Sequence, residues 1–502
     1  MVCAVLASVL PRFQALAAEA PRFARPLGAR AYALGLAVTR GDGSTEPIPV
    51  GATPVVLEAA EVAARRELSA CIASAGFKMA QALVSGAERA VLLDSLGPLE
   101  RRIVERSAPS LRLLAIARVD FFAARHLAAL ELNTTIPAMP GYSDMAARAF
   151  IEEAGRLAGL PEAERSRLRA LNGSNVAALH QALLAGFSVL RPGGAPQRMA
   201  LLCRRADAQL TEVVHLAERF TALGTPAEVV HPDELSSAGA VMARGRRFDL
   251  VYRHLFVRRL EDARHPWLEA LLEGPDAFGA VLLNGPAAHI ETKANFALLS
   301  RAMEEPALAA RAGLTGEELA ALRSSVPWTR LLGHAPGLDP DGRAVADIAA
   351  RVAEEPARFV LKRAWDYGGK AVFVGSHTGE AGFAERSRAA FGAALDWTEL
   401  VDRAAEDRRG GGFVVQERVE VPLETHLLAT DAEAKRADVF VDYSAFCSVG
   451  LPGQPPWGGV VRASASPIVN ILGGGGVLPV LTREVATALD AALTTGSGTG
   501  AA

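Results

Sequence analysis

The sequence is short of cysteine, and its few cysteines lie far apart. Four occur among 502 residues, Cys3, Cys71, Cys203 and Cys447, and no two of them have C-x-x-C spacing. A zinc site or a disulfide framework uses cysteines in closer, paired spacing, so we expect neither. This cysteine usage predicts a protein of the reducing cytoplasm.

An excess of positive charge and long apolar runs are also missing. The formal net charge is -3 and no block of like charges forms an arm or tail, so nucleic acid is not an expected partner. No uninterrupted apolar stretch reaches the roughly 18 residues of a membrane-spanning helix. Residues 1–18 are apolar like a signal peptide, but they lack a basic start and Pro11-Arg12 interrupts them. We therefore expect no membrane partner.

Lysine is scarce, with five among the 53 basic residues. In such an arginine-rich chain, a lysine is notable where a compact point charge serves better than a planar fork. Two of the five lie in one pattern: residues 358–362 read as a strand ending in Lys362, a glycine turn ends at Lys370, and residues 371–375 read as the returning strand. Glycine N–H groups and both ammonium groups can approach one phosphate there. An ordinary surface hairpin with solvated lysines is the alternative.

The composition that is present is globular, with 50% hydrophobic and 22% charged residues, and the length suits two to four domains. Hydrophobic periodicity predicts an α/β (α+β) chain. The expected segments are a largely helical N-terminal region over 1–100, strands followed by helices over 101–190, a parallel α/β domain over 191–290, a part over 291–485 that is chiefly helical to 355 and rich in strands from 357, and a disordered tail over 486–502.

A cluster of polar residues on two neighbouring predicted strands suggests a metal-phosphate site. Arg118 and Asp120 belong to an apolar, β-compatible run at 111–122, and a second short strand at 127–132 leads into Glu131 and Asn133. Residues i and i+2 of a strand point to the same face, so each pair presents its groups side by side. Hard oxygen ligands of this kind suit Mg²⁺ that bridges phosphates. The alternative is solvated strand-end carboxylates paired with arginine.

Three further segments carry candidate binding residues. Residues 140–144 follow the second strand, and they form either an acceptor site or a simple turn. Arg253 follows the carboxyl end of a predicted parallel strand at 248–252, where ligands of such sheets bind, although a solvated basic face is the alternative. Residues 412–417 read as a strand that ends in Gln416 and Glu417. The candidate substrate residues are Tyr142, Ser143, Asp144 and Arg253.

Taken in order, these motifs resemble the circularly permuted ATP-grasp proteins, including the synthetase domain of glutathionylspermidine synthase. The R-x-D and E-x-N pairs precede the lysine hairpin, the reverse of the order in ordinary ATP-grasp ligases, and the likeness spans most of residues 111–481. It implies an inserted Rossmann-like domain at 191–290, with ATP and Mg²⁺ as cofactors. The implied roles are charge stabilisation by Arg118, Lys362 and Arg462, metal binding by Asp120, Glu131 and Asn133, and nucleotide binding by Lys293, Lys362, Lys370, Gln416 and Glu417, with Asn470 in a late segment that faces the phosphates or the acyl group.

The resemblance implies a ligase that joins a carboxylate to an amine. ATP would activate the acid as an acylphosphate, and the amine would then displace phosphate. A phosphotransferase on the same core and a non-catalytic nucleotide-binding protein are the alternatives, because a fold does not fix a function. The chain shows no amidase domain with a nucleophilic cysteine. Its hairpin reads Asp366-Tyr-Gly-Gly-Lys, whereas glutathionylspermidine synthases are expected to have Gly-Arg-Glu-Gly at this place. The acid, the amine and the oligomeric state are therefore left open.

Overall fold

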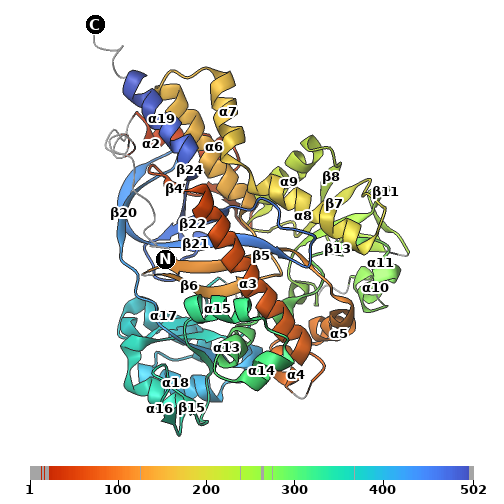
Figure 1. Cartoon of the computed structure of the whole chain (residues 1–502), viewed down its shortest axis with the longest axis vertical. Helices are drawn as coiled ribbons and strands as arrows, with labels where there is room; N and C mark the ends of the chain where they lie inside the picture. The colour runs from red at the N-terminus through yellow and green to blue at the C-terminus, as the bar shows by residue number, and fades with distance from the viewer. Residues whose placement is uncertain are drawn as a thin grey trace.

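The computed structural model describes Phe13, Leu16 and residues 22–496, apart from residues 87, 125, 238, 262–264, 274 and 367. Within this range the fold is mixed α/β: a large central sheet lies between helices, with a smaller sheet at one end and a parallel sheet at one side (Figure 1). The signal-peptide comparison falls almost wholly on residues outside this range. None of the helices in the described ranges is long and apolar enough to cross a membrane.

The central sheet has seven strands in the order β20, β3, β23, β22, β21, β5 and β6. Its longer strands are formed by largely apolar stretches of sequence. Strand β5 is an example, since all of its residues except the last are buried. The expected strands at 111–122 and 127–132 are confirmed as β5 and β6. The strands span Glu424–Ala429 (β20), Val50–Gly51 (β3), Gly476–Leu478 (β23), Gly459–Ser464 (β22), Ala434–Val449 (β21), Leu114–Ala123 (β5) and Leu127–Asn133 (β6).

Helices cover both faces of the central sheet. Helix α3, which crosses one face diagonally (Figure 1), starts at a capping box formed by Glu58 and Glu61 and buries Met79 in a core shared with β21. On the other face, Phe150 of α6 and Leu179 of α8 belong to a second core. The helices of these layers are α3 (Ala59–Leu83), α4 (Arg89–Leu93), α5 (Pro98–Ser107), α12 (Ala288–Glu291), α13 (Lys293–Ala302), α14 (Pro306–Arg311) and α15 (Gly316–Ser325), and on the second face α2 (Ala24–Ala33), α6 (Pro140–Leu157), α7 (Glu162–Asn172) and α8 (Asn175–Leu190).

The N-terminal region is not purely helical. Strand β3 lies inside the central sheet between β20 and β23, and β4 (Val55–Leu57) pairs in parallel with β24 (Val480–Thr482). Helix α2 runs to Ala33, and the strand β1 (Ala37–Thr39) follows it, paired with β2 (Thr45–Pro47). Sequence periodicity missed β3 and β4, which are two and three residues long and pair with strands more than 370 residues away.

The alternating pattern after residue 197 forms a four-stranded parallel sheet in the order β13, β12, β7, β8, as expected. We call residues 199–283 the parallel-sheet unit. Its strands are β7 (Met199–Cys203), β8 (Ala227–Val230), β12 (Leu250–His254) and β13 (Val281–Leu283), its helices are α9 (Leu210–Ala222), α10 (Trp267–Glu273) and α11 (Pro275–Phe278), and β9 (Ser236–Ser237), β10 (Val241–Ala243) and β11 (Arg246–Phe248) form a small antiparallel sheet beside it.

A second antiparallel sheet, the small sheet, has the order β14, β19, β17, β18. The predicted lysine hairpin is confirmed, since Lys362 on β17 pairs with Val372 on β18. The bounds here are β14 (Thr329–Leu331), β17 (Phe359–Arg363), β18 (Val372–Val374) and β19 (Phe413–Glu417), with β15 (Gly337–Leu338), β16 (Ala344–Val345), α16 (Ile348–Glu354), α17 (Ala381–Phe391) and α18 (Trp397–Glu406) packed nearby.

The expected disordered tail from 486 is wrong over residues 486–496. Helix α19 spans Arg483–Gly496 and packs against α6 and α7, and Val485 and Leu489 are fully buried in the core that those helices share. The apolar residues of 485–493 recur at helical spacing, which the glycines and threonines that follow obscured. Residues 497–502 lie outside the described range.

Candidate functional site

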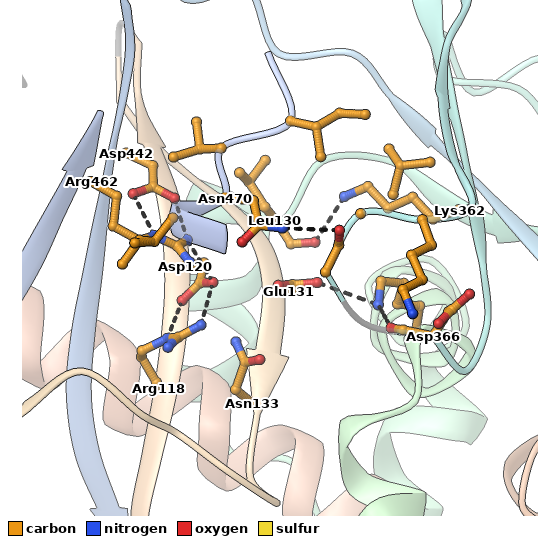
Figure 2. A pocket seen from close by; sticks show the side chains of 18 of the residues that line it. Arg118, Asp120, Leu130, Glu131, Asn133, Lys362, Asp366, Asp442, Arg462 and Asn470 are labelled. Atoms are coloured by element: carbon orange, nitrogen blue, oxygen red, sulfur yellow. Dashed lines mark hydrogen bonds and ion pairs between the residues drawn. The ribbon is translucent and has the colours of Figure 1, made fainter. Parts of the chain in front are cut away.

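A cavity of about 370 Å³ opens between the central sheet, the small sheet and the parallel-sheet unit. Figure 2 shows its polar groups on facing walls. Residues that sequence analysis placed in different motifs are thereby brought together. The predicted site residues that line the cavity are Arg118, Asp120, Glu131, Asn133, Tyr142, Lys293, Lys362, Lys370, Gln416, Glu417 and Arg462, joined by Asn470.

One wall is the polar face of the central sheet. Across β5 and β6, Asp120 pairs with Glu131 and Arg118 pairs with Asn133. Strand alternation sends these four side chains into the same cavity, as the spacing predicts, while the residues between them, such as Val119, face the core. Two carboxylates, an amide and a guanidinium thus occupy neighbouring positions on one surface.

Four buried charged groups form a network on this wall. Arg118 donates to both oxygens of Asp120, at 2.7 Å from Nε and 2.9 Å from Nη2, and Arg462 Nη2 donates to Asp120 Oδ2 at 2.9 Å. Arg462 also contacts Asp442, its cross-strand partner, through Nε at 3.0 Å and through Nη2. Figure 2 shows Asp120 between the two guanidinium groups. Two anions and two cations therefore balance each other inside the cavity wall.

The two carboxyl groups of this network have different pKa values. Burial raises the pKa of Asp120, but Arg118 and Arg462 outweigh that effect and hold the pKa below its usual range. Burial, helped by the negative charge of Asp120, raises the pKa of Asp442 to about 6, because Arg462 and the weaker effect of Arg118 offset only part of the desolvation. Asp120 is therefore ionised at neutral pH, as a metal ligand must be.

The small sheet supplies the opposite wall. Lys362 donates from Nζ to Gln416 Oε1 at 2.7 Å and to the Leu130 carbonyl at 3.1 Å. Burial lowers the pKa of Lys362 to about 8. Glu417 follows Gln416 on β19 and pairs with Arg358 at 3.0 Å. Lys362 is thus a desolvated cation aimed at the cavity, held by neutral acceptors rather than by a carboxylate.

A second lysine approaches the central sheet from the start of helix α13. Lys293 Nζ donates to the Asp366 carbonyl at 3.0 Å and lies 3.4 Å from Glu131 Oε2. Its own N–H donates to the Ala364 carbonyl at 2.8 Å, which fixes the helix start against the lysine hairpin. Lys293 therefore bridges the two walls of the cavity.

The donor set fits magnesium in chemistry. Asp120, Glu131 and Asn133 offer hard oxygens on adjoining strands. The buried Nδ2 of Asn133 has no hydrogen-bond partner among the described residues, so no acceptor fixes the orientation of this amide from its nitrogen side. Within the described ranges no group of three or more His, Cys, Asp and Glu is arranged to hold a metal. Asn133 is not one of these four residue types. Of the three oxygen-bearing side chains, Asp120 is ion-paired to Arg118 and Arg462, and Glu131 is ion-paired to Lys293.

A glycine turn covers the cavity and meets a second loop. Gly368 and Gly369 both have positive φ, and a Cβ on Gly369 would lie 2.3 Å from Cγ2 of Ile468. Asn470 Nδ2 donates to the Gly368 carbonyl at 3.1 Å. The turn that carries Lys370 is therefore packed directly against residues 467–471, and both segments line the cavity.

Two of the predicted substrate residues, Ser143 and Asp144, do not line this cavity. Ser143 is buried and donates to the Gly459 carbonyl at 2.8 Å. Asp144 accepts from the Asn175 N–H at 2.9 Å and from Ser174, so it holds the start of helix α8. Neither lines the cavity, because residues 140–144 are the first turn of α6, whose side chains point in several directions.

Arg253, the fourth predicted substrate residue, does not line the cavity either. Its guanidinium is buried and donates to the carbonyls of Leu255 at 2.5 Å and Gly285 at 3.1 Å, outside the cavity lining. Residues after the carboxyl ends of the parallel strands do reach the cavity, as is general for such sheets. Arg204 follows β7, Arg259 follows β12, and both line the cavity. Tyr142 lines it too, although its hydroxyl donates to the Ala37 carbonyl at 2.7 Å.

Asp442 and Glu291 are two carboxylates of the cavity wall that sequence analysis missed. Asp442 lies on β21 between Val441 and Tyr443, where a charge among apolar residues could have marked it. Glu291 lines the cavity and accepts from the N–H groups of Thr134 and Thr135 at 2.6 and 2.5 Å. Only the folded chain reveals it, because α12 and the end of β6 are distant in sequence.

No protein-family model and no curated protein matches the chain. Among solved structures, a glutathione synthetase-like effector (GSS30) from Globodera pallida, in its apo form, is 11% identical with a TM-score of 0.58, covering 95% of this chain and 100% of that one. A candidate gamma-glutamylcysteine synthetase from Methylobacillus flagellatus is 13% identical and covers 81% of this chain and 94% of its own. Its TM-score of 0.37 is too low to show a shared fold. The first likeness shows a shared fold.

Proposed function

We propose that this protein is an ATP- and Mg²⁺-dependent ligase that joins a carboxylate to an amine, built on a circularly permuted ATP-grasp fold in which the parallel-sheet unit is the inserted domain. One observation carries the proposal: a single cavity sets Arg118, Asp120 and Glu131 of the central sheet opposite Lys362 of the small sheet. The fold shared with a glutathione synthetase-like effector supports it.

In this proposal ATP lies between the two sheets. Lys362 and Lys370 meet the phosphates, Lys293 lies beside them, and Gln416 and Glu417 stand at the adenine end of β19. Asp120, Glu131 and Asn133 would hold magnesium, which supplies charge neutralisation and orientation of the phosphates. The buried cations Arg118 and Arg462 face the terminal phosphate, where negative charge is greatest during transfer.

The reaction has two steps. A carboxylate oxygen of the acid attacks the γ-phosphorus, the bond to ADP breaks, and an acylphosphate forms. The amine nitrogen then attacks the acyl carbon, phosphate leaves and the nitrogen loses a proton, which leaves an amide. The glycine turn, held by Asn470 and Ile468, would exclude water that otherwise hydrolyses the acylphosphate.

The acid substrate is expected beside the parallel-sheet unit. Arg204 and Arg259 line that side of the cavity and replace Arg253 in the role suggested by sequence. Two cations at the carboxyl ends of parallel strands favour an anionic acid, and Tyr142 forms the adjoining wall.

The test is ADP release from ATP and Mg²⁺ with a panel of acids, including glutathione, and amines, including glycine and spermidine. The ligase predicts ADP release that needs both an acid and an amine, with an amide as product. A phosphorylated product formed without an amine would instead identify a phosphotransferase. Failure to bind Mg·ATP in calorimetry would reject both activities.

A further inference from the structure

The loop of residues 134–139, which joins β6 to helix α6, is held by charged side chains from three separate elements. Glu291 of α12 binds two N–H groups at its start, and Arg118 of β5 donates from Nη1 to the Ala138 carbonyl at 2.9 Å. Ile136, Ala138 and Met139 line the cavity. The conformation of this loop therefore shapes the cavity wall next to the buried charges.

The third support comes from the parallel-sheet unit. Glu212 of α9 is fully buried, and its carboxylate accepts from the N–H groups of Met139 at 3.1 Å and Gly141 at 2.9 Å. Met139 has φ 91°, a conformation that costs energy for a side chain of its size. A buried acceptor fixed at this N–H holds the backbone in that conformation.

Glu212 and Arg118 bind the two ends of one peptide group. The carbonyl of Ala138 and the N–H of Met139 belong to the same planar unit, so they move together. The carboxylate sits at the N–H end and the guanidinium at the carbonyl end, which is the arrangement that a peptide dipole favours. Arg118 donates from Nε and Nη2 to Asp120 and from Nη1 to this peptide group, so the peptide group holds the third nitrogen of the guanidinium.

We propose that Glu212 is a positioning residue that sets Arg118 for the terminal phosphate through the Ala138–Met139 peptide group. The inference rests on the proposed function, since it needs ATP at this cavity. It gives the parallel-sheet unit a part in phosphate recognition without direct contact, and it makes Glu212 act through Arg118 alone.

The experiment compares E212Q with wild type and with E218Q, an exposed position on the same helix. Affinities for Mg·ATP and Mg·ADP are measured by calorimetry. We expect E212Q to weaken Mg·ATP at least fivefold and to change Mg·ADP less than twofold, with E218Q like wild type. In an R118K background, E212Q should add less than a twofold effect, because its only route is already lost. A full, additive effect on R118K, or an unchanged preference for ATP, overturns the proposal.

Hydrogen exchange separates this inference from the proposed function. E212Q should speed exchange of the Met139 and Gly141 amides at least tenfold, and unchanged exchange at both overturns the proposal even if no nucleotide binds. Gly141→Ala is a second variant that keeps the charge, since its Cβ would lie 3.0 Å from Glu212 Cγ and displace the carboxylate. We expect the same loss of ATP preference. If wild type binds neither nucleotide, both the proposed function and the role of Glu212 in phosphate recognition fail.

Discussion

The charged residues of the cavity differ in how many oppositely charged partners they have. Asp120 has two arginine partners, Glu131 has one lysine, and Lys362 has only neutral acceptors. A charge with weak compensation is the most responsive to a ligand or to pH. Glu131 and Lys362 are therefore the most informative residues to alter.

Glu131→Gln tests the proposed metal site. The substitution removes one anionic ligand but keeps shape, so nucleotide affinity should stay within an order of magnitude while turnover falls at least about a hundredfold. Steady-state ADP release and calorimetry with Mg·ATP measure the two effects. Glu420→Gln, whose side chain is 85% exposed, is the matched control. Unchanged turnover would remove Glu131 from the site.

Lys362 predicts a pH dependence of nucleotide binding. Its pKa in the free protein is about 8, so the ammonium is present below that pH and lost as pH rises through it. Since polyanion binding favours the charged form, Mg·ATP affinity should be full below about pH 8 and fall up to about tenfold per pH unit above it. K362R, which stays charged, should flatten the profile, and K435R, at an exposed position, should not. Identical profiles for wild type and K362R would contradict the assignment.

At the scale of elements, the cavity depends on two short segments that meet above it. The glycine turn belongs to the hairpin of β17 and β18, and residues 467–471 follow β22 of the central sheet. The glycine turn is attached to the small sheet and residues 467–471 are attached to the central sheet, so their contact joins the two walls of the cavity.

Gly369→Ala should separate these segments. Its new Cβ would meet Ile468, so we expect a loss of about 1–2 kcal/mol in stability and at least a threefold rise in ADP released per amide formed, as water reaches the acylphosphate. Gly379→Ala has the same positive φ cost with nothing within 4 Å of the new Cβ, and it isolates the contact from the backbone term. If both variants behave alike in the product ratio, the turn does not exclude water.

Local patterns predicted the elements well and the side-chain roles less well. The strands of Arg118 and Glu131 and the lysine hairpin were predictable because alternation and glycine turns act within a few residues. The place of Asp144 outside the cavity was not predictable, because its partners at the start of α8 are brought to it by helix packing. Asp442 was missed because its meaning depends on Arg462 across the strand pair. Contacts between distant segments decide which polar residues face the cavity.

At the scale of the whole molecule, strands from the first sixty residues pair with strands from beyond residue 420. Strand β3 lies between two strands from beyond residue 424, and β4 pairs with β24. Helix α2 adds to this, since its Gly28 lies against the backbone of Thr430 in the turn between β20 and β21. Strand β3 is therefore a structural part of the central sheet, and helix α2 packs against the turn that joins two strands of that sheet.

Gly28→Ala tests this connection. A Cβ there would lie 2.2 Å from the Thr430 carbonyl oxygen, a backbone atom that cannot rotate away, so we expect a loss of at least about 2 kcal/mol in the free energy of unfolding. Urea denaturation followed by tryptophan fluorescence measures it. Gly41→Ala has nothing within 4 Å of its Cβ and should change stability by less than about 0.5 kcal/mol. Equal stability of the two variants would show that α2 can shift freely.

The network of Arg118, Asp120, Arg462 and Asp442 has a consequence for how the cavity would be loaded. It is an internal salt of two anions and two cations, so the protein carries counterions for both halves of a metal phosphate. Binding then becomes a double exchange in which the metal takes a carboxylate and the phosphate takes the guanidinium groups. Few ions from the solvent take part in such an exchange, so the affinity for Mg·ATP should respond weakly to added salt.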